Sequence, residues 1–268
     1  MRIIHRFDFK GDDLVKGINF EGLRPLAKIE NIIDAWGEDK LREMHFQGAT
    51  SSIHDKIFNT NIIEMVRKKI SRPISVGGGI KNIQIAKKII SSGADRITVN
   101  TQLFKQKDFY SKLIKELGLS TVIVSIDVSK MNNEYYCFIE NGRESTKIRL
   151  VDHLNSITSI NKGEILITNI DTDGTSNGID KKLIDVVCNY SGPLILSGGF
   201  SRVEDVLYFK ERTENPSSGV SIGKAFHNFI MKSKNFKNNK NFAFASNFDY
   251  SFNSNLNNSI DPETLFSL

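Results

Sequence analysis

The chain has little cysteine and proline and a single tryptophan: 2 Cys, 5 Pro and 1 Trp among 268 residues. Two cysteines, Cys137 and Cys188, cannot build a disulfide framework or a four-ligand zinc site, so we expect a reducing compartment. No apolar run reaches the roughly 18 residues of a membrane-spanning helix. The opening MRIIHRFDFKGDD lacks the apolar stretch of a secretion signal. These absences predict a cytoplasmic protein with no membrane partner.

Charge and motif content exclude further classes. Lys and Arg number 36 against 31 Asp and Glu, a formal charge of +5 without a dense basic stripe, so we expect no nucleic-acid partner. Anionic small molecules such as phosphates remain possible ligands. The five histidines show no paired metal spacing, and Asp171–Thr175 lacks the final glutamate of a calcium loop. The sequence therefore predicts no metal and no cofactor.

Short β-branched runs alternate with amphipathic segments along the chain. The helix-like segments include 59–70, 83–92, 179–190 and 203–212. The candidate strands are Arg2–Asp8, Leu41–Gln47, Pro73–Val76, Arg96–Asn100, Thr121–Asp127, Glu164–Asn169, Pro193–Ser197 and Gly219–Gly223. Eight strand–helix alternations favour a (β/α)8 TIM barrel, with a doubly wound open sheet as the alternative.

Internal repetition favours the barrel over the open sheet. Glycine turns at Gly78 and Gly198 are 120 residues apart, and the strand-end aspartates Asp8 and Asp127 are 119 apart. Two half-barrels of four strand–helix units each would produce both offsets. We therefore expect a two-fold repeat within the barrel.

The predicted domain organisation is a barrel over 1–230 and a tail over 231–268. Polar and aromatic residues alternate over 131–146, where Asn141–Gly142 is a strong turn signal, so we expect an inserted β-hairpin there. The tail is rich in Asn, Ser, Lys and Phe without a clear period, which predicts loose order. Its phenylalanines either pack against the barrel or reflect compositional drift alone.

The two strand-end carboxylates are candidate catalytic groups. In (β/α)8 barrels the reactive side chains lie at the carboxyl ends of the strands, where Asp8 and Asp127 fall. Two carboxyl groups in different surroundings can act as acid and base. The alternative is that each caps a helix or braces a loop.

Glycine turns on both halves predict a ligand with a phosphate at each end. Gly77–Gly79 and Gly198–Gly199 each lie between a strand and a helix, where backbone N–H groups and the helix dipole bind anions. Gly223–Lys224 and Asn100–Thr101 follow two further strands. Tight turns alone would also explain the glycines, and Asp173 is either a substrate contact or a helix cap.

Taken together, these residues resemble the cyclase subunit of imidazole glycerol phosphate synthase. The matching stretches cover residues 2–228, essentially the whole expected barrel, and leave out the tail. They are RIIHRFDFKGDDLVKG (2–17), NFEGLR (19–24), VGGGI (76–80), GADRITVNT (93–101), VSIDVSK (124–130), EILITNIDTDGT (164–175) and SGG (197–199).

The resemblance implies a reaction and its residues. In that family, ammonia from a glutaminase subunit, held in a heterodimer, crosses the barrel. It attacks a bis-phosphorylated ribulosyl-formimino aminoimidazole carboxamide ribotide, giving imidazole glycerol phosphate and an aminoimidazole carboxamide ribotide. Asp8 and Asp127 match the acid/base pair, and Lys16 matches a lysine in a mobile first βα loop. Expected phosphate and substrate contacts are Gly79, Asn100, Thr101, Thr168, Asp173, Gly174, Gly198, Gly199, Gly223 and Lys224.

The resemblance also implies a partner face at the opposite end of the barrel. A ring of charged residues there gates ammonia in the family, and it matches Arg2, Glu43, Arg96 and Glu164, with Lys usual where Arg96 stands. A structural layer of ion pairs is the alternative, and the two interpretations are compatible. Asp95 matches a position that contacts the glutaminase.

Departures from the family pattern leave other functions open. The usual Pro-Cys-Leu-Asp reads His5–Arg6–Phe7–Asp8, and Gly48 replaces an aspartate at the end of the second strand. If side chains alternate along the strand, Arg6 lines the barrel and adds a charge beside Asp8. These changes, with GINFEGLR (17–24), resemble a branch thought to place an amidino group on an activated, nucleotide-linked sugar in surface-polysaccharide synthesis. A single-phosphoribosyl isomerase of the same pathway and a non-catalytic scaffold for the glutaminase are further alternatives.

Overall fold

A closed barrel of eight parallel strands forms the centre of the molecule. The computed structural model describes residues 1–51, 57–232, 260–266 and 268. The strands close on themselves because β12 pairs with β1 and β10 pairs with β7, both in parallel. This confirms the predicted (β/α)8 barrel. The barrel strands are β1 (Arg2–Lys10), β4 (Met44–Gly48), β5 (Ile74–Gly77), β6 (Arg96–Val99), β7 (Val122–Met131), β10 (Ile165–Asn169), β11 (Leu194–Ser197) and β12 (Gly219–Ile222).

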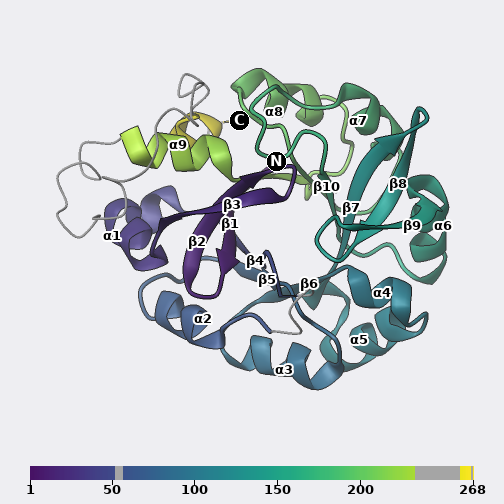
Figure 1. The fold of residues 1–268 in the computed structure, drawn as a ribbon, viewed down its shortest axis with the longest axis horizontal. Coiled ribbons are helices and arrows are strands. Elements are labelled where there is room, and N and C mark those ends of the chain that lie inside the picture. Colours follow the sequence, from purple (N-terminus) through teal and green to yellow (C-terminus); the bar gives the residue numbers. More distant parts are fainter. Residues whose placement is uncertain (52–56, 233–259, 267) are drawn as a thin grey trace.

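Helices surround the strands (Figure 1). Side-chain caps fix several of their first turns: Asn82 accepts a hydrogen bond from the Ile85 N–H at the start of α3, and Asp180 accepts from the Lys182 N–H at the start of α7. The helices around the barrel are α1 (Ile29–Lys40), α2 (Thr60–Arg67), α3 (Ile83–Ser91), α4 (Thr101–Lys105), α5 (Phe109–Leu117), α6 (Leu150–Ile160), α7 (Lys181–Val187), α8 (Val203–Lys210) and α9 (Lys224–Lys232). A short 3-10 turn, Leu119–Thr121, precedes β7.

Strand β1 shows how the sequence divides between the barrel interior and the helix layer. Successive side chains on a strand point to opposite faces. His5 faces the helices, where its ring stacks on Phe226 at 4.3 Å and meets Trp36 edge-on at 5.3 Å. The alternate residues face the interior and are, in order, Arg2, Ile4, Arg6 and Asp8.

Two antiparallel hairpins extend the barrel. The first, β2 (Asp13–Ile18) and β3 (Glu21–Ala27), pairs with the end of β1. It occupies the region expected to be a loop, so Lys16 lies within a strand. The second, β8 (Glu134–Ile139) and β9 (Glu144–Arg149), pairs with the extended end of β7. The expected hairpin over 131–146 is therefore a three-stranded meander whose first turn is Asn132–Asn133, both with positive φ.

The end of the chain returns to the barrel. Helix α11 (Pro262–Phe266) packs Leu265 into the core, and the Arg42 guanidinium lies 4.6 Å from the centre of the Phe266 ring. Most of the expected tail, 233–259 and 267, lies outside the described residues, so the domain boundary and the predicted loose order stay predictions. Among the described residues, none of the helices has both the length and the apolar character needed to cross a bilayer.

Candidate active site

The two candidate carboxylates occupy equivalent positions in the two halves of the barrel. Asp8 lies on β1, the first barrel strand, and Asp127 lies on β7, the fifth. Both point inward near the carboxyl ends of their strands, where Asp8 is in register with Gln47 and Asp127 with Thr168. The buried side chain of Arg6 is within electrostatic reach of both carboxylates. The structure therefore brings the expected acid/base pair to one mouth of the barrel.

Asp8 is held by two cations. The Arg6 Nε donates to Asp8 Oδ1 at 2.9 Å and the Lys16 Nζ donates to Asp8 Oδ2 at 3.0 Å. All three residues are buried. Burial alone would raise the pKa of Asp8, but the charges of Arg6 and Lys16 and their hydrogen bonds outweigh it and hold that pKa well below its usual range. Asp8 is therefore an ionised carboxylate at every physiological pH.

Asp127 has a contrasting environment. Its one hydrogen bond within the described contacts comes from the amide Nδ2 of Asn100, at 2.9 Å. Burial raises the pKa of Asp127 to about 6, because the Arg6 charge and the Asn100 hydrogen bond offset only part of the desolvation. The negative charge of Asp173 adds to the rise. Asp127 can therefore take up and release a proton near neutral pH.

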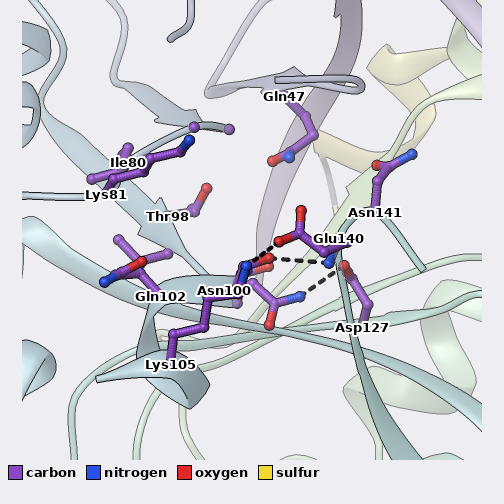
Figure 2. A pocket seen from close by; sticks show the side chains of 15 residues that line it. Gln47, Ile80, Lys81, Thr98, Asn100, Gln102, Lys105, Asp127, Glu140 and Asn141 are labelled. Atoms are coloured by element: carbon purple, nitrogen blue, oxygen red, sulfur yellow. Dashed lines mark hydrogen bonds and ion pairs between the residues drawn. The ribbon is translucent and has the colours of Figure 1, made fainter. Parts of the chain in front are cut away.

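A pocket of about 690 Å³, partly open to solvent, lies beside Asp127 (Figure 2). Gly78 and Gly79 form a turn in its wall, with φ of 104° and 73°. A Cβ on Gly78 would lie 2.8 Å from the Gly48 backbone, so glycine is required there. The expected contacts Gly79, Asn100 and Thr101 all line it. Residues not anticipated from the sequence also line it: Gln47, Ile80, Lys81, Thr98, Val99, Gln102, Lys105, Ser125, Glu140 and Asn141.

A second pocket of about 300 Å³ lies on the other half of the mouth. Gly198 and Gly199 have φ of 94° and 88°, and a Cβ on Gly199 would lie 2.3 Å from the Gly178 carbonyl oxygen, so only glycine fits this turn. The Lys224 Nζ donates to the Gly174 carbonyl at 2.6 Å. The expected residues gathered here are Asp173, Gly174, Gly198, Gly199, Gly223 and Lys224.

Lys16 and Asp173 connect the first hairpin to this second pocket. The Lys16 Nζ lies 3.5 Å from Asp173 Oδ2, and the Asn19 N–H donates to the Asp173 carbonyl at 2.9 Å. Asp173 is thus an ion-pair partner of the hairpin rather than a helix cap. Phe20, at the hairpin turn, lies 5.7 Å from the Arg6 guanidinium. The β2–β3 hairpin therefore covers the Asp8 side of the mouth.

Arg6 points into the barrel, as strand alternation predicts. Its side chain leaves β1 and reaches the far wall, where Nη1 donates to Thr168 Oγ1 on β10 and to Ser197 Oγ on β11, each at 3.2 Å. With the bond from Nε to Asp8, these contacts hold the guanidinium across the mouth. The expected substrate contact Thr168 is therefore occupied by Arg6.

His45 is an interior residue that the sequence analysis did not assign to the site. Its Nδ1 lies 3.0 Å from Ser75 Oγ and its Nε2 lies 3.3 Å from Gln47 Oε1. Burial, and then the nearby Arg6 charge, lower the pKa of His45 to about 3, so its ring is neutral. The alternation of side chains along a strand could have placed it, because His45 lies two residues after Glu43 and therefore faces the same side of the strand.

The opposite end of the barrel carries a closed ring of four charges. Arg2 binds Glu43 at 2.8 Å, and Arg96 binds Glu43 at 3.0 Å and Glu164 at 2.8 Å. Arg2 also pairs with Glu164, which completes the ring. The four residues expected to gate ammonia are therefore joined to one another, each arginine bridging both carboxylates.

Asp95 lies at the same end as the ring and is half-exposed. Its Oδ2 accepts from the Arg67 Nη2 at 2.6 Å and from the Ile74 N–H at 2.7 Å. These bonds tie the start of β6 to β5 and α2, and the contact of Asp95 with a partner remains a prediction. Within 1–51, 57–232 and the placed C-terminal residues, no three His, Cys, Asp or Glu side chains are grouped to hold a metal ion.

Comparison with known proteins agrees with this geometry. The family model described as "Histidine biosynthesis protein" matches residues 2–232. The imidazole glycerol phosphate synthase subunit HisF of Lactococcus lactis subsp. cremoris (strain MG1363) is 31% identical over 229 residues, 84% of this chain and 88% of that protein. The HisF subunit of Natranaerobius thermophilus is 31% identical over 238 residues, 88% of this chain and 94% of that protein. The chain therefore belongs to the histidine biosynthesis protein family, and its relatives are HisF-like cyclase subunits.

Proposed function

We propose that this chain is the ammonia-consuming subunit of a two-protein synthase, in which a glutaminase supplies the ammonia. The observation that carries the proposal is the pair Asp8 and Asp127, which meet at one mouth of the barrel with their pKa values shifted in opposite directions. Two carboxyl groups with such different pKa values can play two roles: Asp8 supplies a fixed negative charge, and Asp127 transfers a proton.

The proton transfers follow from that tuning. When the lone pair of neutral ammonia attacks an electrophilic carbon of the substrate, the new C–N bond leaves a positive charge on nitrogen. The Asp127 carboxylate takes a proton from that nitrogen, and the resulting acid delivers it to the departing amine. A pKa of about 6 suits both steps near neutral pH. Asp8 stays ionised and stabilises positive charge that develops on the substrate.

The two pockets indicate the class of substrate. Each is built around glycine turns with positive φ, and together they line the two halves of the mouth. Backbone N–H groups at such turns bind phosphate oxygens. Two such turns fit a ligand with a phosphate at each end. The family resemblance then makes the bis-phosphorylated ribulosyl-formimino aminoimidazole carboxamide ribotide the first candidate substrate, and imidazole glycerol phosphate synthesis the candidate reaction.

Arg6 favours a second candidate. Where the related cyclases have a small cysteine, this chain places a buried guanidinium that binds Asp8, Thr168 and Ser197. Gly48 likewise leaves no carboxylate at the end of β4. This altered mouth fits an enzyme that uses the same ammonia delivery to form an amidino group on an activated sugar.

The charged ring supports the partner assignment. It closes the end of the barrel opposite the mouth, and a glutaminase docked over it would release ammonia directly above the interior. Such a heterodimer would keep ammonia away from bulk water, where it becomes ammonium. In this arrangement Asp95 lies on the docking face.

The test uses the purified full-length chain with an ammonium salt in place of the partner. The bis-phosphorylated ribotide and a nucleotide-linked sugar are offered separately, and product is measured by absorbance and mass. Asp8→Asn and Asp127→Asn should each lower turnover by at least about a hundredfold. Asp34→Asn, an exposed carboxylate on α1 (57% exposed), is the matched control.

Each outcome of this test decides between the alternatives. Turnover of the ribotide supports the first candidate, and amidine formed on the sugar supports the second. Absence of chemistry on both substrates would overturn the proposal, and stimulation of an added glutaminase in a separate assay would then indicate a scaffold. Turnover that survives in both aspartate variants would remove their catalytic role.

A further inference from the structure

Glu140, at the turn between β8 and β9, points its carboxylate into the larger pocket (Figure 2). The Lys105 Nζ donates to Glu140 Oε1 at 2.5 Å, and the Glu140 N–H donates to Thr101 Oγ1 at 3.1 Å. The other carboxylate oxygen, Oε2, is buried and accepts no hydrogen bond from the described residues. A buried carboxylate oxygen without a donor is costly, so it indicates a place where a ligand supplies the missing hydrogen.

The backbone at Glu140 is also in an unusual conformation. An Asn-Gly pair can supply both left-handed residues of a tight hairpin turn, and Asn141–Gly142 is such a pair. Here the left-handed region begins one residue earlier, with φ of 50° at Glu140, 55° at Asn141 and 77° at Gly142. A glutamate rarely adopts a positive φ, and such strain concentrates at ligand sites. Two separate costs therefore fall on one residue of the pocket wall.

Asn100 presents a second acceptor in the same wall. Its Nδ2 donates to Asp127 Oδ2 at 2.9 Å and to the Phe138 carbonyl at 3.0 Å. An ionised carboxylate and a carbonyl can only accept, so these two bonds use both amide hydrogens and fix which way the amide points. Oδ1 is thereby left buried without a donor among the described residues. The Asn100 side chain has no hydrogen left for a phosphate and offers a ligand an oxygen instead.

The pocket wall therefore offers a ligand two kinds of contact. The backbone N–H groups of the Gly78–Gly79 turn suit phosphate oxygens, which accept hydrogen bonds. Glu140 Oε2 and Asn100 Oδ1 suit hydrogen-bond donors, which a dianionic phosphate ester lacks and a hydroxyl group has. The Lys105 ammonium balances the charge of Glu140, which reduces its repulsion of a phosphate. This combination fits a ligand that carries hydroxyl groups beside a phosphate.

We infer that Glu140 Oε2 and Asn100 Oδ1 bind two neighbouring hydroxyl groups of a sugar whose phosphate lies at the Gly78–Gly79 turn. The placing of a phosphate at that turn rests on the proposed function. Glu140 is then a specificity-determining residue, carried by the β8–β9 hairpin, that selects a sugar phosphate over a plain phosphate ester. Both candidate substrates contain hydroxylated sugars that bear phosphate, so the inference deepens the site without choosing between them.

Isothermal titration of the full-length chain tests this without the complete substrate or the glutaminase. The probes are ribose 5-phosphate, 2-deoxyribose 5-phosphate, which lacks one hydroxyl group, and methyl phosphate, which has no hydroxyl group on carbon. We expect ribose 5-phosphate to bind about tenfold more tightly than the deoxy ester, the effect of one hydrogen bond to a charged group, and methyl phosphate to bind most weakly. Equal affinities for the ribose and deoxyribose esters, or no binding of ribose 5-phosphate at millimolar concentration, would overturn the inference.

Variants of the hairpin assign this preference to the larger pocket. Glu140→Gln keeps an oxygen for Lys105 and replaces Oε2 with an uncharged amide nitrogen, so the tenfold preference for ribose 5-phosphate should fall to about twofold. The ratio of the two affinities cancels effects common to both probes. Glu134→Gln, which changes a half-exposed carboxylate on the same hairpin, is the matched control and should keep the preference. Glu140→Ala is the second variant should Glu140→Gln fold poorly, and a preference unchanged in the folded variant would overturn the inference.

A crystal structure of the chain with ribose 5-phosphate locates the contacts directly. We expect the phosphate at the Gly78–Gly79 turn and two hydroxyl oxygens within hydrogen-bond distance of Glu140 Oε2 and Asn100 Oδ1. A phosphate at this turn with the hydroxyl groups directed to solvent, or a sugar bound in the smaller pocket alone, would overturn the inference.

Turnover with an ammonium salt separates this role from catalysis. On whichever candidate substrate reacts, Glu140→Gln should raise KM about tenfold and lower kcat less than about threefold, because the hydroxyl contacts are made equally in the bound substrate and in the transition state. A lower kcat with an unchanged KM would contradict the specificity role. Absence of turnover on both substrates in the wild type would contradict the proposed function instead, and the titrations would still decide the inference.

Discussion

The Asp8 and Asp127 halves of the mouth share a backbone plan and differ in charge. Both aspartates lie at the same place in the two-fold repeat, yet Asp8 contacts two cations and Asp127 contacts one amide. The difference originates two residues earlier on each strand, where Arg6 stands on β1 and Ser125 on β7. A repeated backbone therefore does not repeat the electrostatics: Arg6 and Lys16 keep Asp8 an anion, whereas Asp127, without such ion-pair partners, titrates.

The strongest way to break this contrast is to remove Arg6. Arg6→Met leaves Asp8 buried with Lys16 alone, and breaking a buried ion pair costs about 3–5 kcal/mol in the free energy of unfolding. Urea denaturation at neutral pH measures the loss. Arg149→Met, which removes an exposed arginine that also pairs with two carboxylates, is the matched control and should cost much less. Equal losses of unfolding free energy in the two variants would show that the buried Arg6–Asp8 pair stabilises the fold no more than an exposed pair.

A second, smaller effect concerns pH and has opposite signs on the two halves. The folded pKa of Asp127 is raised from 3.8 to about 6, so the wild type loses stability as pH rises through this window. Asp127→Asn does not titrate and should gain up to about 3 kcal/mol relative to the wild type between about pH 4 and about pH 8. Asp8→Asn should instead lose most at the higher pH, because the stability from Asp8 is present above its unfolded pKa and is lost in acid. Urea curves from about pH 2 to about pH 8 measure both, because the Asp8 contribution is lost below about pH 4 and the Asp127 contribution changes above it. Shifts of the same sign would refute the contrast.

The smallest predicted effect sharpens the role of Asn100. Its Nδ2 hydrogen bond lowers the pKa of Asp127, so Asn100→Ser should raise that pKa by about 0.7 unit, the equivalent of one hydrogen bond. Because the proposed base is the ionised carboxylate, the acid limb of the rate profile should move to higher pH by the same amount. Gln102→Ala, in the same pocket but bonded to Gln106, should leave the midpoint in place. A midpoint that moves equally in both variants would assign the titration to another group.

The fold could be predicted from the sequence because its signals are local and repeated. Eight β-branched runs with helices between them, and glycine turns at Gly78 and Gly198, are sufficient to indicate a closed barrel with two similar halves. Strand parity also predicted that Arg6 would face inward with Asp8. These inferences depend on the two-residue period of a strand, which operates within a few residues.

The parts that could not be predicted depend on contacts between distant segments. The family resemblance implied a loop where the β2–β3 hairpin lies. The hairpin turn has positive φ at two non-glycine residues, Asn19 (53°) and Phe20 (66°), which sequence patterns rarely indicate. The reach of Arg6 to Thr168 and Ser197 depends on the width of the barrel rather than on spacing along the chain. Likewise, Glu140 and Asn141 line the larger pocket because β7 continues beyond Asp127 and carries the β8–β9 hairpin back over the mouth.

The ring at the far end of the barrel has a consequence for how that end could open. Arg2 and Arg96 each bridge Glu43 and Glu164, so no side chain can leave the ring without breaking two ion pairs at once. The four charges sum to zero, so a docking surface of either sign gains nothing from simple attraction. Freeing one arginine would therefore require competing hydrogen bonds at both of its carboxylate contacts at once.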